Sequence, residues 1–221
     1  MHVQIIGVTK PKEYFEFITA EELISYCARV SNPANALNFK TAPKLLKYLI
    51  NHKHFSPFEM VNVVMEINTT RDIARQILRH RSFSFQEFSQ RYADPSTLGY
   101  TIREARLQDE KNRQNSIHTD DAKLQQDWSE FQTQVYNLSD QAYNWAIQRG
   151  VAKEVARSVL PEGMTNSRLM MNGTLRSWIH YIELREKNGT QQEHQEIAKA
   201  CKKELMSEFK FLEELDEKKE D

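Results

Sequence analysis

Residues 79–92 read RHRSFSFQEFSQRY and place three arginines, one histidine, three serines and three phenylalanines around one carboxylate, Glu87. A guanidinium group is a rigid planar fork that fits phosphate and carboxylate groups. If the chain runs extended after the RHR triplet, alternate side chains point the same way, so Glu87, Ser89 and Arg91 line one face. Arg79 and Arg91 can then converge on a phosphate. The stretch therefore predicts a binding site for a phosphorylated ligand.

Arginine and lysine are unevenly distributed along the chain. No lysine occurs between Lys53 and Lys111 or between Lys153 and Lys187, although both intervals contain arginines. Lysine is the usual basic residue of a solvated surface, so this distribution suggests two segments that face a common anionic ligand. Composition alone supports surface salt bridging with chance clustering equally well. The arginines of the two intervals are Arg71, Arg75, Arg79, Arg81, Arg91, Arg103 and Arg106, and then Arg157, Arg168, Arg176 and Arg185.

Several of these residues have a simpler interpretation than ligand binding. We expect Arg71 to pair with Asp72 or with solvent, and Arg103 and Arg168 to have surface roles. The three phenylalanines of the stretch are expected in the core rather than as stacking platforms. The histidines of residues 52–54 lack a nearby set of carboxylates or cysteines, so no metal site is predicted.

The composition limits the class of protein. With 221 residues, of which 39% are hydrophobic, the chain can bury a sizeable core, and we expect one domain over 1–221 with a frayed tail from about 215. The net charge of −1 provides no global field for nucleic acid or an anionic membrane. Two cysteines and no signal-like or membrane-spanning stretch lead us to expect a cytoplasmic protein.

The glycines constrain how a nucleotide or flavin could be held. The six glycines are far apart in the sequence, so neither a G-x-G-x-x-G motif nor a P-loop is present. Any such ligand must therefore be held by side chains rather than by a glycine-rich backbone cradle. This conclusion agrees with the enrichment in arginine.

The elements that must position these residues follow from hydrophobic periodicity and capping signals. The pattern predicts an α+β fold, a single helix-rich domain. A strand at 61–68 alternates with Val61, Val63, Met65 and Ile67 on one face. Helix caps are expected at Thr19 (in a capping box with Glu22), Thr41 and Thr70. The further expected elements are a strand at 3–8 and helices at 19–30, 41–52, 70–81, 119–150, 151–159, 174–186 and 190–214.

The longest expected helix, 119–150, carries an apolar stripe with alternating spacings of four and three. Such a stripe is typical of a helix that packs in a core or against another subunit. Its residues are Leu124, Trp128, Phe131, Val135, Leu138, Ala142 and Trp145.

Four segments together resemble a known family. RHRSFSFQEFSQRY is similar to the signature of the flavin-dependent thymidylate synthases, R-H-R-x-x-S followed by S-x-R, with Gln86 where many members have Asn. The segments HFSPFEM (54–60), EVARSVLP (154–161) and LRSWIHYIELR (175–185), together with the helix ARQILRHR (74–81), resemble the rest of the family pattern in the same order.

The resemblance implies an enzyme that converts dUMP to dTMP by reductive methylation. Methylenetetrahydrofolate would supply the carbon, NADPH the reducing equivalents, and a tightly bound FAD the hydride. It also implies a mixed or antiparallel sheet flanked by helices, and a homotetramer whose sites lie at subunit interfaces, with no nucleic-acid or membrane partner.

The resemblance assigns roles to individual positions. Arg185 is the expected catalytic residue, because a guanidinium beside the uracil favours its ionised form and so activates the ring without a cysteine nucleophile. His180 and Thr174 stand where the family often has Asn. The implied FAD contacts are Ser56, Arg79, His80, Arg81, Glu87, Thr174, Arg176 and His180. The implied dUMP contacts are Gln76, Arg79, Glu87, Ser89, Gln90, Arg91, Arg157 and Arg185.

One alternative of a different class remains at this point. The interleaved arginines and phenylalanines of 79–92 could form a groove that binds a nucleotide or single-stranded RNA without catalysis. The near-neutral charge and the carboxylate of Glu87, which would repel a phosphate backbone, count against it.

Overall fold

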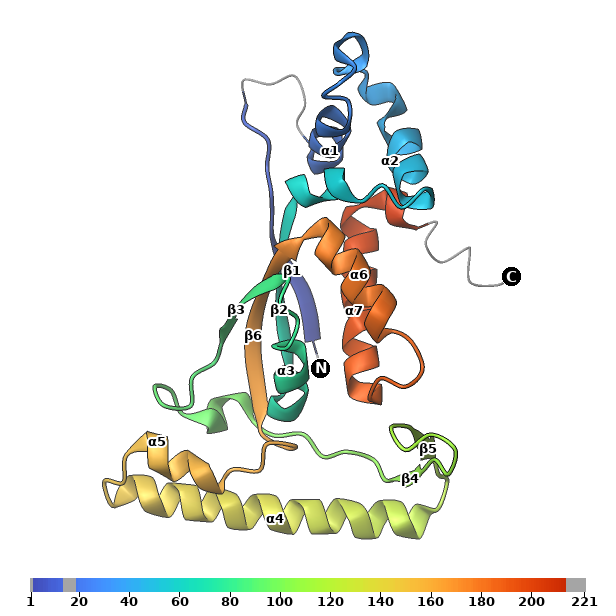
Figure 1. Ribbon diagram of the computed structural model, residues 1–221. Coiled ribbons are helices and arrows are strands. Elements are labelled where there is room, and N and C mark those ends of the chain that lie inside the picture. The colour runs from blue at the N-terminus through green and yellow to red at the C-terminus, as the bar shows by residue number, and fades with distance from the viewer. Residues whose placement is uncertain (1, 14–18, 214–221) are drawn as a thin grey trace.

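A computed structural model describes residues 2–13 and 19–213 (Figure 1). The predicted α+β class is confirmed, and every strand pairing of the central sheet is antiparallel. The tail expected to fray from about 215 lies outside the described residues. The sheet has the order β1-β2-β6-β3, with β1 at His2–Val8, β2 at Asn62–Thr70, β3 at Phe83–Glu87 and β6 at Asn166–Thr174.

The core lies on one face of this sheet. Val63, Met65 and Ile67 of β2 are fully buried, as their alternation predicts. Helices α6 and α7 cover this face, and the indole nitrogen of Trp178 donates a 3.0 Å hydrogen bond to the Val63 carbonyl. The helices around the sheet are α1 (Ala20–Ala28), α2 (Ala42–Asn51), α3 (Arg71–Ile77), α6 (Leu175–Arg185) and α7 (Gln192–Glu208).

The strand β6 was not predicted, although it pairs with both β2 and β3. Its buried residues alternate, but they include Ser167 and Gly173 beside Leu169 and Met171, which weakens the apolar signal. Gly173 is required because the Phe83 ring lies against it, and an added Cβ would come within 2.4 Å of that ring. Phe83 and Phe85 pack against the core, as expected, whereas Phe88, the third phenylalanine of this stretch, is half-buried outside that cluster.

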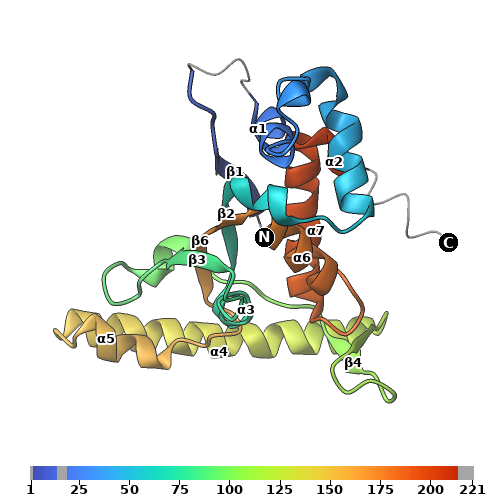
Figure 2. The same ribbon diagram turned by 45° about the horizontal axis from the view of Figure 1, so that its top comes forward.

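A separate arm crosses the end of the molecule opposite α1 and α2 (Figures 1 and 2). It contains the 27-residue helix α4 (Ala122–Gln148), the short helix α5 (Lys153–Ala156) and a hairpin of β4 (Arg106–Gln108) with β5 (Ser116–His118). Among the described residues, no helix has both the length and the apolar character needed to cross a membrane.

Helices α1, α2 and α3 begin directly after the predicted cap residues, but two of the three caps differ from expectation. The helix expected from 119 begins instead at Ala122, where Asp121 is the cap. Thr19 forms the predicted capping box with Glu22. The Thr41 hydroxyl instead accepts a 2.7 Å bond from Arg29. The Thr70 hydroxyl donates a 2.6 Å bond to Asp72 rather than capping α3. The short 3₁₀ turns lie at Pro33–Asn35, Phe39–Thr41, Ser56–Met60 (η3), Pro95–Leu98, Arg157–Val159 and Lys210–Leu212.

Candidate functional site

The two arginine-bearing segments meet where α6 ends. Helix α3 ends at Ile77, so the chain turns through residues 79–82 beside the last turn of α6. There the Arg185 Nε donates a 2.9 Å hydrogen bond to His80 Nε2. Since these residues are 105 positions apart, this contact brings together the segments that the arginine distribution predicted to share a ligand.

His80 is an uncharged partner for Arg185. Burial, and then the charges of Arg185 and Arg79, lower the pKa of His80 to about 4. The imidazole is therefore neutral at pH 7, and its Nε2 can accept the bond from Arg185. Among the described residues no carboxylate forms an ion pair with Arg185, so its positive charge is uncompensated and suits an anionic ligand.

Glu87 lies at the end of β3 in a set of basic and hydroxyl groups. It accepts a 2.9 Å bond from the Ser167 hydroxyl and a 3.4 Å bond from Arg71 Nη1, and Arg75 lies 3.8 Å away. The expected pairing of Arg71 with Asp72 or solvent is wrong. Arg71 is only 6% exposed and points to Glu87 and Glu162 instead.

The residues that follow β3 do not continue the strand. The backbone N–H groups of Tyr92 and Ala93 both donate to the Ser89 carbonyl, which closes a turn. The expectation that Glu87, Ser89 and Arg91 line one extended face is therefore wrong. Arg91 instead reaches Glu154 of α5, at 3.6 Å.

Two further predicted nucleotide contacts lie in this neighbourhood. Gln90 is 4% exposed, and its Nε2 has no hydrogen-bond partner among the described residues. Because an unsatisfied buried donor is costly, this atom is suited to a ligand acceptor. Arg157 lies close enough to Arg71 for its charge to contribute to lowering the pKa of Arg71, after the larger effect of burial.

A second group of predicted residues surrounds the contact between η3 and α6. Arg176 forms an ion pair with Glu59 of η3, and the His180 ring packs edge-on against Phe55 with centroids 4.8 Å apart. Ser56 is exposed at the start of η3. The Thr174 hydroxyl accepts the 3.2 Å bond from Ser177 that caps α6, so this hydroxyl already has a structural role.

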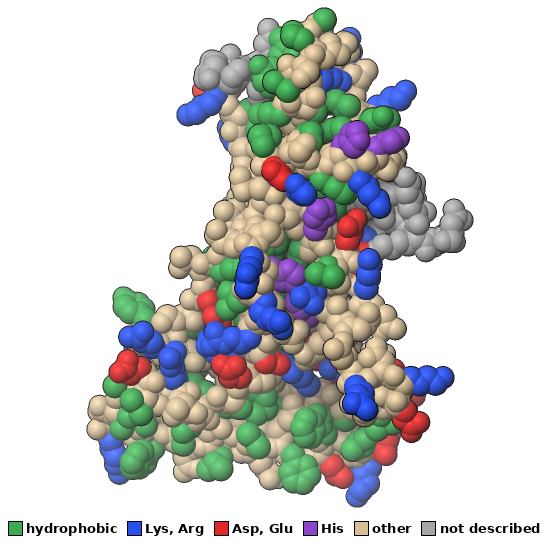
Figure 3. Space-filling model, in the orientation of Figure 1, with side chains coloured by type: hydrophobic (Ala, Val, Ile, Leu, Met, Phe, Trp, Pro, Cys, Tyr) green, Lys and Arg blue, Asp and Glu red, His purple; other side chains and the backbone are tan. Residues whose placement is uncertain are grey.

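The exposed part of the site is basic. Arg79 and Arg81 are exposed, and within the described chain neither forms an ion pair. Basic and histidine side chains gather on the middle of the face shown in Figure 3. These groups offer the donors that a phosphate or a flavin needs when no glycine-rich cradle exists.

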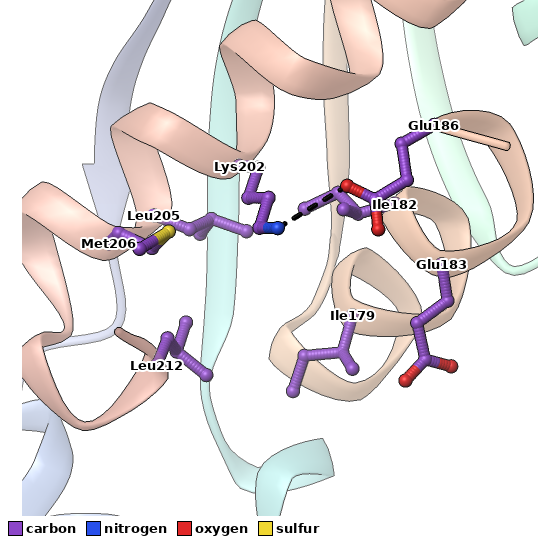
Figure 4. A pocket seen from close by; sticks show the side chains of 8 residues that line it. All are labelled: Ile179, Ile182, Glu183, Glu186, Lys202, Leu205, Met206 and Leu212. Carbon is purple, nitrogen blue, oxygen red and sulfur yellow. Dashed lines mark hydrogen bonds and ion pairs between the residues drawn. The ribbon is translucent and has the colours of Figure 1, made fainter. Parts of the chain in front are cut away.

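An apolar cavity on another side of α6 is a poor candidate for this ligand (Figure 4). Its volume is about 50 Å³, too small for a nucleotide or a flavin. An ion pair between Lys202 and Glu186, at 3.4 Å, lies at one wall. The other lining side chains are Ile179, Ile182, Glu183, Leu205, Met206 and Leu212.

Some residues of this region were missed or misjudged from the sequence. Arg103, expected at the surface, forms a bidentate pair with Asp72 in which both distances are 2.8 Å. Gln76, a predicted nucleotide contact, accepts from His194 Nδ1 at 3.2 Å, and its amide nitrogen donates to Gln191 at 2.7 Å. No sequence signal pointed to His194, because its partners lie more than 100 positions away or on the neighbouring helix.

The sequence is similar to a known family and to named proteins. Residues 15–209 match the model of the family described as "Thymidylate synthase complementing protein". A "Probable flavin-dependent thymidylate synthase" of Paramecium bursaria Chlorella virus 1 is 52% identical over 210 residues, which cover 95% of each chain. A "Flavin-dependent thymidylate synthase" of a Synechocystis species is 49% identical over 211 residues, covering 95% of this chain and 96% of that one.

A solved structure shares the fold. The UMP/dUMP methylase PolB from Streptomyces cacaoi, bound with 5-Br dUMP, superimposes with a TM-score of 0.77 over 96% of this chain and 93% of its own. At 22% sequence identity, this likeness supports the fold alone.

Proposed function

The chain belongs to the flavin-dependent thymidylate synthase family, and on this premise we propose that it converts dUMP to dTMP by reductive methylation with FAD as its flavin. Methylenetetrahydrofolate is the proposed carbon donor and NADPH the proposed reductant. The single observation that carries the proposal is the bond between Arg185 and His80, because it joins the two family segments at one place.

The proposed FAD contacts lie mainly in two parts of the fold. Ser56, Arg176 and His180 lie around η3 and the start of α6, and residues 79–81 follow α3. Their hydroxyl, guanidinium and imidazole groups suit the phosphates and the polar ring edge of FAD. When bound, the flavin would supply the hydride. We expect Thr174 to act chiefly through the cap that it gives to α6.

The dUMP contacts are proposed beside this flavin position. Arg185 presents an uncompensated charge, so it would stabilise negative charge on the pyrimidine ring and raise the electron density at C5. Its neighbour His80 keeps that guanidinium in place without neutralising it. Glu87, at the end of β3, is held by the ion pair with the buried Arg71. The remaining proposed dUMP contacts are Gln76, Arg79, Ser89, Gln90, Arg91 and Arg157.

A homotetramer is proposed as the working form. Six large apolar residues of α4 are between 37% and 68% exposed on one helix face, which is unusual for a surface helix without a partner. Arg91 and Arg185 are both proposed dUMP contacts, but within one chain Arg91 forms an ion pair with α5 and Arg185 contacts His80. Because the two arginines have different partners within one chain, we propose that residues of neighbouring subunits complete each site. The exposed stripe comprises Leu124, Trp128, Phe131, Val135, Leu138 and Trp145.

The decisive experiment is an assay of dTMP formation in which FAD, NADPH and methylenetetrahydrofolate are omitted one at a time. Omission of NADPH or methylenetetrahydrofolate should abolish the product, and omission of FAD should abolish it once the tightly bound flavin has been stripped from the protein. As purified, the protein should show a flavin spectrum that NADPH bleaches and air restores. Arg185→Ala should lower turnover at least about 1,000-fold while it retains FAD, because it removes a charge needed in the transition state.

Lys187→Ala is the matched control, since it removes an exposed cation two residues further along the chain. Its turnover should remain close to that of the wild type. Loss of FAD from Arg185→Ala with unchanged turnover of the remaining loaded protein would contradict the assigned role. A colourless protein that FAD cannot reconstitute would contradict the proposed function as a whole.

A further inference from the structure

Five side chains form a continuous chain of hydrogen bonds behind the proposed dUMP position. Tyr181 OH lies 3.1 Å from His194 Nε2, and His194 Nδ1 lies 3.2 Å from Gln76 Oε1. The Gln76 amide nitrogen donates to Gln191 Oε1 at 2.7 Å, and the Gln191 amide nitrogen donates to Glu193 at 2.9 Å. This series of hydrogen bonds links α6, α7 and α3, and Gln76 is the only one of its five residues that is a predicted ligand contact.

The carboxylate at one end sets the direction of every bond. Burial alone would raise the pKa of Glu193, but hydrogen bonds from its own backbone, Arg106 and Gln191 hold that pKa below its ordinary value. An ionised carboxylate can only accept hydrogen bonds. The nitrogen of Gln191 must therefore face Glu193, and its oxygen must face Gln76. It follows that Gln76 turns its nitrogen to Gln191 and its oxygen to His194.

The other end of this series of hydrogen bonds is compatible with that orientation. His194 is fully buried, and burial, then Arg185 and His80, lower its pKa to about 3, so the ring is neutral. Because Gln76 presents its oxygen, the single ring proton lies on Nδ1, and Nε2 accepts from the Tyr181 hydroxyl. Reversing the Gln76 amide would turn its oxygen toward the Gln191 oxygen, so that two acceptors would face each other without a hydrogen bond between them.

We propose that this chain locks the Gln76 amide in one orientation and so makes the site select uracil over cytosine nucleotides, with His194 as a positioning residue. The inference rests on the proposed function, in which Gln76 contacts dUMP. In this proposal the Gln76 amide distinguishes uracil from cytosine, and His194 and Gln191 fix the orientation of that amide.

The physical reason lies in the two bases. Neutral uracil carries an acceptor at position 4 and a donor at position 3, and cytosine carries the reverse. This difference acts when dUMP binds, before Arg185 stabilises negative charge on the ring. After its internal bonds, Gln76 retains one N–H and one oxygen lone pair. An amide free to rotate by 180° can complement either base, whereas a fixed amide complements only one. The wrong base then leaves buried polar groups unpaired, which costs more than tenfold in binding.

A competing interpretation is that His194 only fills the core. Two variants of similar size separate the interpretations. The side-chain nitrogen of His194→Asn lies near the Nδ1 position and keeps the donor to Gln76, but it loses Tyr181. His194→Gln reaches the Nε2 position and keeps a partner for Tyr181, but it offers nothing to Gln76. A packing role would favour the longer Gln, whereas a positioning role favours Asn.

The test measures KM for dUMP, kcat, and the dissociation constants of dUMP and dCMP by calorimetry, with flavin content and melting temperature as references. His194→Gln should raise KM and the dissociation constant for dUMP about tenfold. It should also lower the preference for dUMP, which is the dissociation constant of dCMP divided by that of dUMP, about tenfold. His194→Asn should stay within about threefold of the wild type in both. Equal changes in the two variants, or a larger loss of preference in His194→Asn, would overturn the inference.

A second pair keeps the test valid if the buried variants do not fold. Gln191→Met removes the partner of the Gln76 nitrogen at a half-buried position, and Gln192→Met makes the same change at the next, exposed residue. Only Gln191→Met should narrow the preference, about three- to fivefold. An unchanged preference in Gln191→Met would overturn the inference. A wild type that forms no dTMP with all co-substrates would instead contradict the proposed function.

Discussion

Helices α4 and α7 are both amphipathic, but their apolar faces have different surroundings. In α7, Ile197, Cys201 and Leu205 are at most 1% exposed, because they pack in the core beside α6 and the sheet. In α4, Phe131 and Leu138 are 62% and 68% exposed. The same type of sequence pattern is therefore buried within the chain in α7, whereas in α4 it is exposed in the single chain, where we propose that a neighbouring subunit covers it.

Their polar contacts also differ. The buried polar residue of α7, His194, belongs to the chain of bonds that reaches Gln76. The buried polar residue of α4, Gln132, exchanges two bonds with the backbone of Arg103, at 3.0 and 2.8 Å. Arg103 in turn pairs with Asp72 of α3. Polar contacts thus place α7 within the site, whereas in α4 they fasten the arm to the body.

The largest effect is expected from breaking the partnership proposed for α4. Phe131→Asp combined with Leu138→Asp places two charges in the exposed stripe, where desolvating them on assembly is costly. The proposed tetramer should dissociate in light-scattering measurements, and dTMP formation should fall at least about 100-fold, because the sites proposed to be shared between subunits would be lost. The circular dichroism spectrum should not change, since both side chains are exposed in the single chain.

The matched control adds the same two charges elsewhere on α4. A helix turns by about 100° per residue, so Asn137 and Asn144 lie roughly 120° around the helix from Phe131 and Leu138. Both positions are exposed, and the control variant is Asn137→Asp with Asn144→Asp. The control should retain the assembly and most of the activity. A tetramer that survives the stripe variant, or dissociates equally in both, would show that α4 does not carry the interface.

A smaller effect is expected from loosening the arm within one chain. Arg103→Ala removes the bidentate pair and leaves Asp72 largely buried, so the free energy of unfolding should fall by about 3 kcal/mol in urea titration. Arg168→Ala is the control, because the Arg168 side chain is 48% exposed and its ion pair with Glu66 spans 3.9 Å. That change should cost less than about 1 kcal/mol. Equal losses would contradict a special role for Arg103.

The two arginines show what the sequence could and could not predict. Both were expected at the surface, and nothing in the sequence around residue 103 distinguishes it from 168. Local signals predicted most helices, the strands β1 and β2 and the Thr19 cap, because each depends on neighbours within a few residues. The strand β6 was missed because its central position is fixed by pairing with β2 and β3, not by its own composition.

For the site, family resemblance identified residues that the fold brings together, such as His80 and Arg185. The resemblance did not identify the residues that hold these site residues in position. The pairing of Arg71 with Glu87 and of His194 with Gln76 spans 16 and 118 positions, and no periodicity encodes such contacts. The supporting groups of a site are therefore harder to predict than the groups that touch its ligand.

The smallest effect concerns α7 alone and depends on pH. His194 ordinarily has a pKa near 6.5, and in the folded protein it is lowered to about 3 by burial, Arg185 and His80, while Gln76 and Tyr181 contact the neutral ring. The unfolded chain therefore binds a proton that the folded chain does not, and stability is lost as the pH falls below about 6.5. Between pH 7 and 5 the wild type should lose about 2 kcal/mol more than His194→Asn, which has no group to titrate there. Urea titrations across this range measure the difference directly, because the contribution of His80 is common to both proteins. Parallel curves would mean that His194 is already charged or solvated in the folded state, and the neutral tautomer assigned to His194 would then be wrong.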